Sequence, residues 1–339
     1  MNNFKIICNN INKIMYSEYQ LKPFKALNAK SIKANRNGYL INIEFKNIGN
    51  GYSDLFSWPE LGDLDVRLLL ENIKNSKFNI HTYKTIYFAY IDACYRAKNL
   101  NIFSNFTFPK NHYTEVDISL LNLKKIEKIK NDGFELIKIK LSKEEIENTE
   151  KLTRFFNNIK SSQLKIRIDF NNSLDSDLLE NFLNKFYNFL NIIDFIEDPY
   201  FLFFKDREKY KSKFSLLSLA IDRLNLEDYS NNVDLNVDYF ILKPAIQNFI
   251  DKKFSVPVVI SSYMDHPLGQ LSALYEAGLF NQGCLADKMS CGLLTHQFYE
   301  MNEYAETLTI QNTRLLPSLE GTGFGFNSLL KNEHWKELK

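Results

Sequence analysis

The hydrophobic pattern changes its period within the first third of the chain. Up to residue 55, apolar and polar side chains alternate in short runs, such as residues 39–45 after the turn pair Asn37-Gly38. This alternation predicts antiparallel strands with a hairpin turn at Asn37-Gly38. Between residues 62 and 100 the apolar positions shift to helical spacing, which predicts helices there. These positions are Leu64, Leu68, Ile73, Ile86, Tyr90, Ile91 and Cys94.

A rhythm of strand followed by helix begins after residue 110. Short apolar runs rich in Ile, Val and Phe alternate with amphipathic segments, of which residues 175–190 are an example. Such alternation is typical of a parallel sheet with crossover helices. The runs are residues 135–141, 164–170, 192–197, 216–222, 239–243 and 256–261, with weaker candidates at 114–118 and 283–287. Their number favours an eight-stranded (β/α) barrel over an open sheet.

These two hydrophobic patterns predict an α/β protein, namely a TIM-like barrel with an α+β capping domain at the N-terminus. We expect the capping domain over residues 1–110 and the catalytic barrel over residues 111–312. A C-terminal segment, residues 313–339, is expected to pack back on the cap. A chain of 339 residues is long enough for two such domains.

Composition narrows the class of partner. The chain has 42 Lys and Arg against 41 Asp and Glu, a net charge of +1, so nothing in its bulk charge favours nucleic acid or an anionic membrane. Four scattered cysteines without a CxxC pair predict a reduced, cytoplasmic setting. We find no apolar run of about 20 residues and no signal-peptide pattern, so membrane insertion is not expected. A small-molecule ligand remains, and the oligomeric state stays open.

Ionisable residues close five consecutive predicted strands. In order they are Lys140, Asp169, Glu197, Asp222 and Lys243, each about one βα unit after the last. The C-terminal ends of barrel strands meet at one mouth, where active sites of this architecture lie. A single acid at a strand end is usually a helix cap, and a single lysine usually reaches solvent. Five at one-unit spacing favour one site.

The residue types predict metal-assisted proton transfer. Three carboxylates on adjacent strands repel one another unless a cation lies among them, and oxygen ligands suit Mg²⁺ better than Zn²⁺. A lysine enclosed beside that cation can act as a base near neutral pH. The five histidines are isolated, so a zinc site is not expected, and His266 is the one nearest the predicted mouth.

These residues resemble the o-succinylbenzoate synthase family, in the muconate-cycloisomerase-type branch of the enolase superfamily. The matching motifs are Lys138-x-Lys140, Arg167-x-Asp169-x-Asn171, Leu242-Lys243-Pro244, Ser261-Ser262 followed by Leu268-Gly269, and the cap segment from Gly51 to Glu60. The resemblance implies a Mg²⁺-dependent lyase that dehydrates 2-succinyl-6-hydroxy-2,4-cyclohexadiene-1-carboxylate to o-succinylbenzoate in menaquinone biosynthesis. Its substrate is a small-molecule carboxylate.

The resemblance also implies roles for single residues. Lys140 would remove the α-proton and Lys243 would stabilise the enediolate. The metal ligands would be Asp169, Glu197 and Asp222. The substrate-binding set would be Lys138, Arg167, Asn171, Ser261, Ser262 and Gly283, with the last three near the succinyl tail.

The chain departs from the family pattern next to a proposed metal ligand. Arg223 follows Asp222 where the family commonly has an acid, and Asp198, Asp265 and Ser53-Asp54 replace frequent Glu or Gly-Glu residues. Two alternatives stay open. One is an N-acyl amino acid racemase or dipeptide epimerase of the same superfamily, and the other is a barrel that has lost catalysis and only binds.

Overall fold

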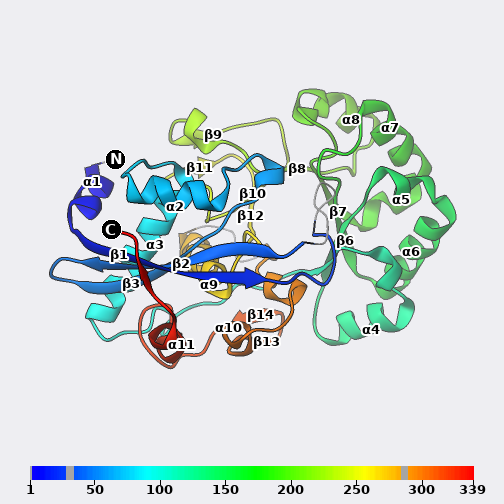
Figure 1. The fold of residues 1–339 in the computed structure, drawn as a ribbon. Helices are drawn as coiled ribbons and strands as arrows, with labels where there is room; N and C mark the ends of the chain where they lie inside the picture. The colour runs from blue at the N-terminus through cyan, green and yellow to red at the C-terminus, as the bar shows by residue number, and fades with distance from the viewer. Residues whose placement is uncertain (1, 28–33, 284–288) are drawn as a thin grey trace.

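The computed structural model describes residues 2–27, 34–283 and 289–339. An antiparallel sheet of β1 (Ile11–Leu21), β2 (Arg36–Phe45), β3 (Gly49–Leu55) and β15 (Lys336–Glu337) lies on one side of the molecule, in the order β15-β1-β2-β3. It packs with α1 (Asn2–Asn9), α2 (Val66–Lys74) and α3 (Ile80–Ala97), on the left of Figure 1. We call these seven elements, with the turn 56–63 that follows β3, the cap.

The predicted hairpin turn at Asn37-Gly38 is wrong. Both residues lie inside β2, where Gly38 pairs with Tyr19 of the long strand β1. The tight turn falls instead at residues 46–48, between β2 and β3, where Asn47 takes a left-handed backbone with φ of 62°. Asparagine tolerates that conformation better than most residues, which explains the position of the turn.

A curled parallel sheet of seven strands forms the second part, in the order β12-β10-β8-β7-β6-β5-β4. The strands are β4 (Tyr113–Glu115), β5 (Leu136–Lys140), β6 (Lys165–Asp169), β7 (Ile193–Glu197), β8 (Leu219–Ile221), β10 (Tyr239–Leu242) and β12 (Val258–Ile260). Residues 291–292 join its two edges, since Cys291 bridges Asn111 beside β4 and Gly292 bridges Ser261 after β12. The predicted TIM-like barrel is confirmed, and we call this part the barrel.

The last barrel strand differs from its prediction. Residues 283–287 were the candidate, but Gly283 is the last residue of α9 (Pro267–Gly283), and residues 284–287 lie outside the described part of the chain. The eighth position is held by the short segment 291–292. A two-residue bridge carries no apolar run, so hydrophobic pattern alone does not reveal it.

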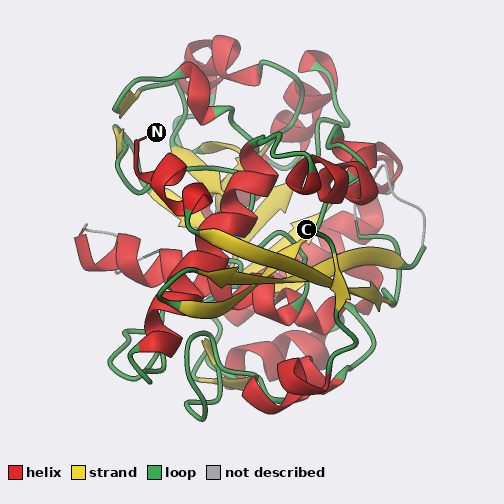
Figure 2. Cartoon of the chain, turned by 60° about the vertical axis from the view of Figure 1, so that its left-hand side comes forward, coloured by secondary structure: helices red, strands yellow, loops and turns green. Residues whose placement is uncertain are grey.

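Helices cover the outer face of the barrel (Figure 2). They are α4 (Leu123–Asn131), α5 (Lys143–Glu147), α6 (Thr149–Ser162), α7 (Ser176–Lys185), α8 (Arg207–Lys213) and α9. Four of them begin at residues whose side-chain oxygens accept from a backbone N–H of the first turn, which is the usual N-cap bond. These caps are Asn122, Ser142, Asn148 and Asp175.

Short elements complete the chain. The 3₁₀ helices are Pro59–Leu61, Ile118–Leu120, Tyr187–Ile192, Phe203–Asp206, Leu226–Asp228 and Thr295–Phe298. The remaining elements are β9 (Asn232–Val233), β11 (Lys253–Phe254), α10 (Glu303–Glu306), β13 (Thr309–Gln311), β14 (Arg314–Leu316) and α11 (Asn327–Asn332). The C-terminus returns to the cap, where Glu337 of β15 pairs with Met15 of β1.

The barrel interior is apolar below and polar at its mouth. Phe195, Ala220, Ile241 and Val259 form a buried cluster. Side chains two residues apart on a strand share a face, so the next inward positions are Glu197, Asp222, Lys243 and Ser261. Strands β7, β8, β10 and β12 therefore place ionisable or polar side chains directly above an apolar cluster.

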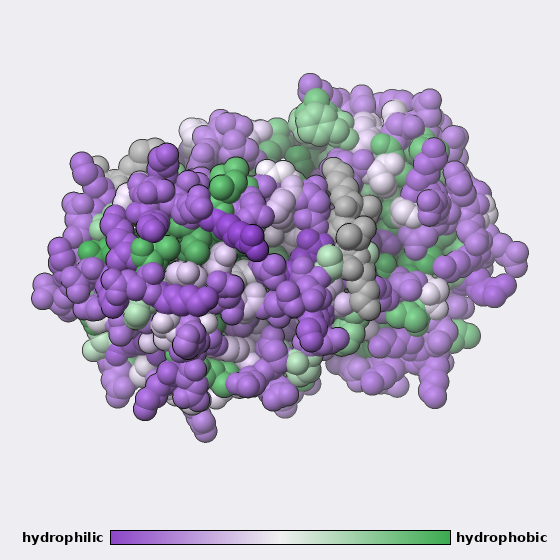
Figure 3. All heavy atoms as spheres, in the orientation of Figure 1, coloured by the Kyte–Doolittle hydropathy of each residue, from purple (hydrophilic) through white to green (hydrophobic). Residues whose placement is uncertain are grey.

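The outer surface of the molecule is predominantly hydrophilic on the face shown in Figure 3. Among the described residues, no helix is long and apolar enough to cross a membrane.

Candidate active site

A cavity of about 150 Å³ lies at the mouth of the barrel. Lys140 of β5, Asp169 of β6 and Lys243 after β10 contribute to its lining, and Trp58 and Leu61 from the cap cover it. The strand register explains this convergence, because Lys140 pairs with Asp169 and Asp169 pairs with Glu197 across neighbouring strands. The predicted strand-end residues therefore meet in one place.

Lysine ammonium groups contact all three carboxylates. Lys138 Nζ lies 3.1 Å from Asp169 Oδ2 and 2.6 Å from Glu197 Oε2. Lys243 Nζ forms an ion pair with Asp222 Oδ2. Glu197 is almost completely buried, and Asp169 is buried as well. Charged groups removed from water need such partners, and here two lysines serve three acids, since Asp169 and Glu197 share Lys138.

Lys140 is set apart from the other two lysines. Its Nζ donates to the carbonyl oxygen of Leu27, in the segment that follows β1, at 2.7 Å. Burial lowers the pKa of Lys140, and the charges of Lys138 and Lys243 lower it further, while Asp169 opposes the shift. For Lys138, burial also favours the neutral form, but Asp169 and Glu197 outweigh it and raise the pKa of that lysine. Lys140 therefore gives up its proton more readily than Lys138.

The carboxylates respond to one another as well as to the lysines. Burial raises the pKa of Glu197 to about 7, and the charge of Asp169 adds to the shift. Burial would also raise the pKa of Asp169, but Lys138 and Lys140 lower it below its ordinary value. Asp198, directly after Glu197, has its pKa raised well above normal by burial and then by Asp222. Negative charge is concentrated at this end of the barrel.

The donor set fits a divalent cation. Three carboxylates lie at the ends of neighbouring strands, and the pKa of Glu197 is raised first by burial and then by the charge of Asp169, which a cation between them would offset. In the described part of the chain, no three His, Cys, Asp or Glu side chains adopt a metal-binding arrangement. Lys138 and Lys243 contact these oxygens instead, so metal binding requires the lysines to move aside.

The structure places the predicted substrate-binding residues at different depths. Lys138, Asn171, Ser261 and Ser262 line the cavity at the mouth. Arg167, also expected to bind substrate, does not line this cavity. Arg167 is two residues before Asp169 on the same inward face, so it lies one layer deeper and is only 1% exposed.

Gly283 is also misplaced by the sequence interpretation. It ends α9, a helix of 17 residues that starts near the mouth and runs about 25 Å away from it. The glycine that does line the cavity is Gly292, in the segment that closes the barrel.

The histidine at the mouth is His112 rather than His266. His266 is buried between the rings of Tyr19 and Tyr304 and does not line the cavity. His112 and Thr114 both line it, on the inward face of the first strand. The spacing of two positions between His112 and Thr114 could have indicated a shared face of a strand. However, β4 has only three residues, which is too short for a clear alternating pattern.

Arg223 links the barrel to the cap. Its Nη2 donates to Asp63 Oδ1 at 2.6 Å and to the hydroxyl of Tyr263 at 2.9 Å. Tyr263 in turn donates to Asp63, and Asp63 Oδ2 accepts from the backbone N–H of Trp58 at 2.8 Å. Arg223, which stands where the family commonly has an acid, is therefore paired with Asp63 on the cap turn that covers the mouth.

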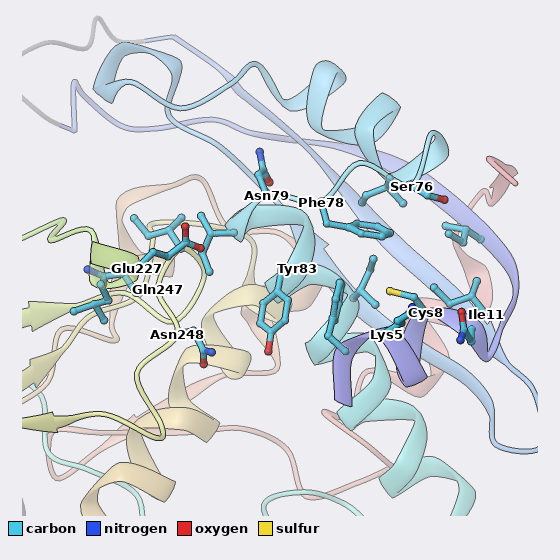
Figure 4. Close-up of a pocket in the computed structure, with 18 of the residues that line it drawn as sticks. Lys5, Cys8, Ile11, Ser76, Phe78, Asn79, Tyr83, Glu227, Gln247 and Asn248 are labelled. Atoms are coloured by element: carbon cyan, nitrogen blue, oxygen red, sulfur yellow. The ribbon is translucent and has the colours of Figure 1, made fainter. Parts of the chain in front are cut away.

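A larger cavity lies elsewhere in the described molecule. A cavity of about 1310 Å³ is lined by α1, α3 and the loops after β8 and β10 (Figure 4). Phe78 and Tyr83 point into it from one side, and Glu227 and Asn248 border it on the other. None of the predicted catalytic or metal-binding residues lines it.

Comparisons with known proteins agree with this geometry. Residues 14–95 match the family model described as O-succinylbenzoate synthase, N-terminal domain. An o-succinylbenzoate synthase of Bdellovibrio bacteriovorus is 30% identical over 335 residues, covering 96% of this chain and 99% of that protein.

Solved structures show the same fold at low sequence identity. Muconate lactonizing enzyme from Pseudomonas fluorescens has a TM-score of 0.69 at 14% identity, covering 93% of this chain and 95% of that one. N-succinyl Arg/Lys racemase from Bacillus cereus has a TM-score of 0.70 at 13% identity, covering 97% of this chain and 100% of that one.

Proposed function

We propose that this protein dehydrates 2-succinyl-6-hydroxy-2,4-cyclohexadiene-1-carboxylate to o-succinylbenzoate. The chain belongs to the o-succinylbenzoate synthase family and is thus an enzyme of that lyase type. We place this step in menaquinone biosynthesis. The observation that carries the proposal is the pair of lysines facing each other across a mouth that holds three carboxylates. The unpaired thiols of Cys8, Cys94 and Cys291 support a cytoplasmic setting.

The lysines occupy opposite sides of the ring of strands. Strands β6, β7 and β8 separate β5 from β10 on one side. On the other side β12, segment 291–292 and β4 separate them. Lys140 and Lys243 therefore approach a substrate in the cavity from opposite faces.

Asp169, Glu197 and Asp222 are the residues that would hold Mg²⁺. When bound, the cation would stabilise the negative charge that develops on the substrate carboxylate as the adjacent carbon loses its proton. The residues themselves supply the rest of the chemistry.

The reaction needs one base that later serves as an acid. Lys140 Nζ, with its lowered pKa, takes the proton from the carbon that bears the carboxylate. Lys243 Nζ, as a cation on the far face, stabilises the resulting enediolate. Lys140 then returns its proton to the hydroxyl that leaves as water from the same face, and the ring becomes aromatic. Enclosure by Trp58 and Leu61 limits access of bulk water to this proton.

The proposal is tested by Lys140→Ala in the purified enzyme with the cyclohexadiene substrate and Mg²⁺. We expect turnover to fall by about 10³-fold or more, because the base is removed, with Mg²⁺ binding and thermal unfolding unchanged. Lys143→Ala, which alters an exposed lysine three residues away, is the matched control. Normal dehydration by Lys140→Ala would contradict the proposal.

The opposed lysines also suit a second reaction. An N-acyl amino acid racemase or dipeptide epimerase exchanges an α-proton between two faces, which needs one base on each. Incubation of an N-succinyl amino acid in D₂O separates the two functions. Deuterium incorporation at the α-carbon with no dehydration of the cyclohexadiene would favour the racemase.

A further inference from the structure

His112 is a buried side chain in the cavity to which neither the proposed mechanism nor the sequence gave a role. It is 4% exposed and immediately precedes β4. Its backbone N–H donates to the carbonyl of Cys291 at 2.9 Å, which fixes the residue to the segment that closes the barrel. The position of His112 is therefore fixed where β4 meets the closing segment 291–292.

Arg167 determines which nitrogen of that ring carries the proton. Its Nε donates to Asp194 Oδ2 at 2.8 Å, and its Nη1 donates to the carbonyl of Ser290 at 2.6 Å. The same Nη1 lies 2.9 Å from His112 Nδ1. A guanidinium has donors only, so Nδ1 must accept, and a neutral ring then has its hydrogen on Nε2.

The surroundings keep the ring neutral. Burial holds the pKa of His112 well below its ordinary value, and the charges of Arg167 and Lys138 lower it further. The carbonyl of Ser290 opposes the shift without reversing it. His112 is thus a neutral donor at Nε2 across the physiological range of pH.

The Nε2 edge of the ring lies close to Gly292, which has no side chain, at the lining of the cavity. A Cβ at Gly292 would lie 2.9 Å from Ser261 Oγ and 3.1 Å from both Nε2 and Cε1 of His112. The backbone of Gly292 is already engaged, since its N–H donates to Ile260 and its carbonyl accepts from Ser262. One N–H donor and one hydroxyl, from His112 and Ser261, therefore border the cavity beside Gly292, where a side chain would crowd them.

We propose that His112 donates its Nε2 hydrogen to an acceptor oxygen on the acyl side chain of the substrate, in the space beside Ser261 and Gly292, and that Arg167 is a positioning residue that fixes this tautomer. The inference rests on the proposed function for the identity of the substrate. An acyl carbonyl is also present in N-acyl amino acids, so the same interaction serves the alternative reaction.

The first test needs no turnover. Long-range ¹H–¹⁵N spectra of the ¹⁵N-histidine-labelled protein distinguish the two neutral tautomers, and the His112→Gln variant assigns the signal. We expect a neutral ring with its hydrogen on Nε2 at pH 7, and a change of the Nε2–H signal when o-succinylbenzoate is added. A hydrogen on Nδ1, or a charged ring, would overturn the assignment whatever the enzyme catalyses.

The second test measures binding in catalysis. His112→Leu removes the donor and should raise KM about 10- to 100-fold, with a smaller change in kcat, while His112→Gln, which keeps an N–H donor, should recover most of the loss. Gly292→Ala should raise KM similarly, because its methyl group fills the space. His296→Leu is the control, since His296 is also buried and bonded at Nδ1, by Gln270, but lies outside the cavity.

Arg167→Lys distinguishes positioning from support of the fold. Lysine keeps the charge but lacks the planar set of donors, so a fraction of His112 should change to the other tautomer and KM should rise. Equal KM values for His112→Leu and the wild type would refute the role, as would an effect no larger than that of His296→Leu. If the wild type lacks dehydratase activity, the proposed function fails, and the KM comparison moves to the N-succinyl amino acid.

Discussion

Buried carboxylates occur in two regions of this molecule, and the two regions stabilise them differently. At the mouth, Asp169 and Glu197 contact Lys138, and Asp222 contacts Lys243. Between the cap and α9, Asp54 Oδ1 accepts from the hydroxyl of Tyr19 at 2.6 Å. There Asp265 Oδ1 has no hydrogen-bond partner within the described chain. The first region supplies lysine cations to its acids, whereas the second supplies a hydroxyl group to Asp54.

The pKa directions follow this difference. Lys138 and Lys140 outweigh burial and lower the pKa of Asp169, whereas burial raises the pKa of Asp54 well above normal and that of Asp265 to about 7. A Cβ at Gly269 would lie 2.5 Å from Asp54 Oδ2 and 2.6 Å from Asp265 Oδ2, so the two carboxyl groups are close together. Lysine charges therefore favour the ionised form of Asp169 at the mouth, and burial favours the protonated forms of Asp54 and Asp265.

The largest expected effect comes from removing one charge at the mouth. Glu197→Gln keeps the shape of the side chain but removes a proposed metal ligand, so kcat/KM should fall by about 10³-fold or more. Stability should change in the opposite direction. Because the folded pKa of Glu197 is raised to about 7, its ionisation destabilises the protein as the pH rises from about 4.5 to 7. In EDTA at pH 8 the variant should be more stable by about 1–3 kcal/mol.

Two measurements decide this prediction. Steady-state kinetics with saturating Mg²⁺ gives the loss of activity, and urea unfolding gives the stability. Full activity, or a large loss of stability at pH 8, would show that Glu197 is a structural partner of Lys138 rather than a ligand.

The second prediction concerns the ion pair at the contact between cap and barrel. Lys84 of α3 and Glu276 of α9 are 1% and 0% exposed, and their charged atoms lie 2.5 Å apart. Lys84→Met leaves Glu276 buried without its cation and should cost about 3–4 kcal/mol in the free energy of unfolding. The double variant Lys84→Met with Glu276→Leu should recover most of that loss. Urea unfolding measures all of these values.

A surface pair supplies the control for this cycle. Lys13 and Glu337 lie 2.7 Å apart, and their side chains are 38% and 66% exposed, so Lys13→Met should change stability by less than about 1 kcal/mol. Similar losses for Lys84→Met and Lys13→Met would remove the distinction between buried and exposed pairs.

The sequence predicted the mouth well because strand ends recur at the spacing of βα units. Lys140, Asp169, Glu197, Asp222 and Lys243 each occupy the last inward position of a strand or the one just after it, and this follows from period and spacing alone. Residues whose place depends on depth or on pairing partners were harder to predict. Arg167 lies one layer lower than expected because the period of two fixes a side chain's face but not its distance from the solvent.

Other errors had causes that only tertiary structure reveals. Pairing with the long strand β1 overrides the turn propensity of Asn37-Gly38. The barrel closes through a two-residue bridge with no apolar run, so Gly283 was assigned where Gly292 lies. His112 was treated as isolated because its partner Arg167 is 55 residues away in the sequence.

The third prediction uses pH to distinguish the two carboxylate regions. The folded pKa of Asp265 is raised to about 7, so the folded state binds the extra proton between about pH 4 and 7. Stability from this group is full below about pH 4 and is lost as the pH rises to about 7. Asp265→Asn removes much of that slope and should be more stable than the wild type by about 2–3 kcal/mol at pH 8. Asp54 still binds a proton in the variant, so part of the pH dependence should remain.

Urea unfolding from pH 4 to 8 tests the slope. Asp251→Asn, an exposed acid, is the control and should parallel the wild type. An Asp265→Asn curve parallel to the wild type would mean that Asp265 is ionised in the folded protein.

The smallest expected effect is at the contact between the barrel and the cap turn, where Arg223 binds Asp63. Arg223→Gln or Asp63→Asn should loosen the turn that carries Trp58 and Leu61 over the cavity. Each should therefore raise KM about 10-fold, which is about 1.4 kcal/mol, and change kcat by less than about threefold. Because both variants break the same contact, the double variant should be no worse than either single one. Effects that add in the double variant would show that the two residues act independently, and that the cap turn is held over the mouth by Trp58 and its own packing.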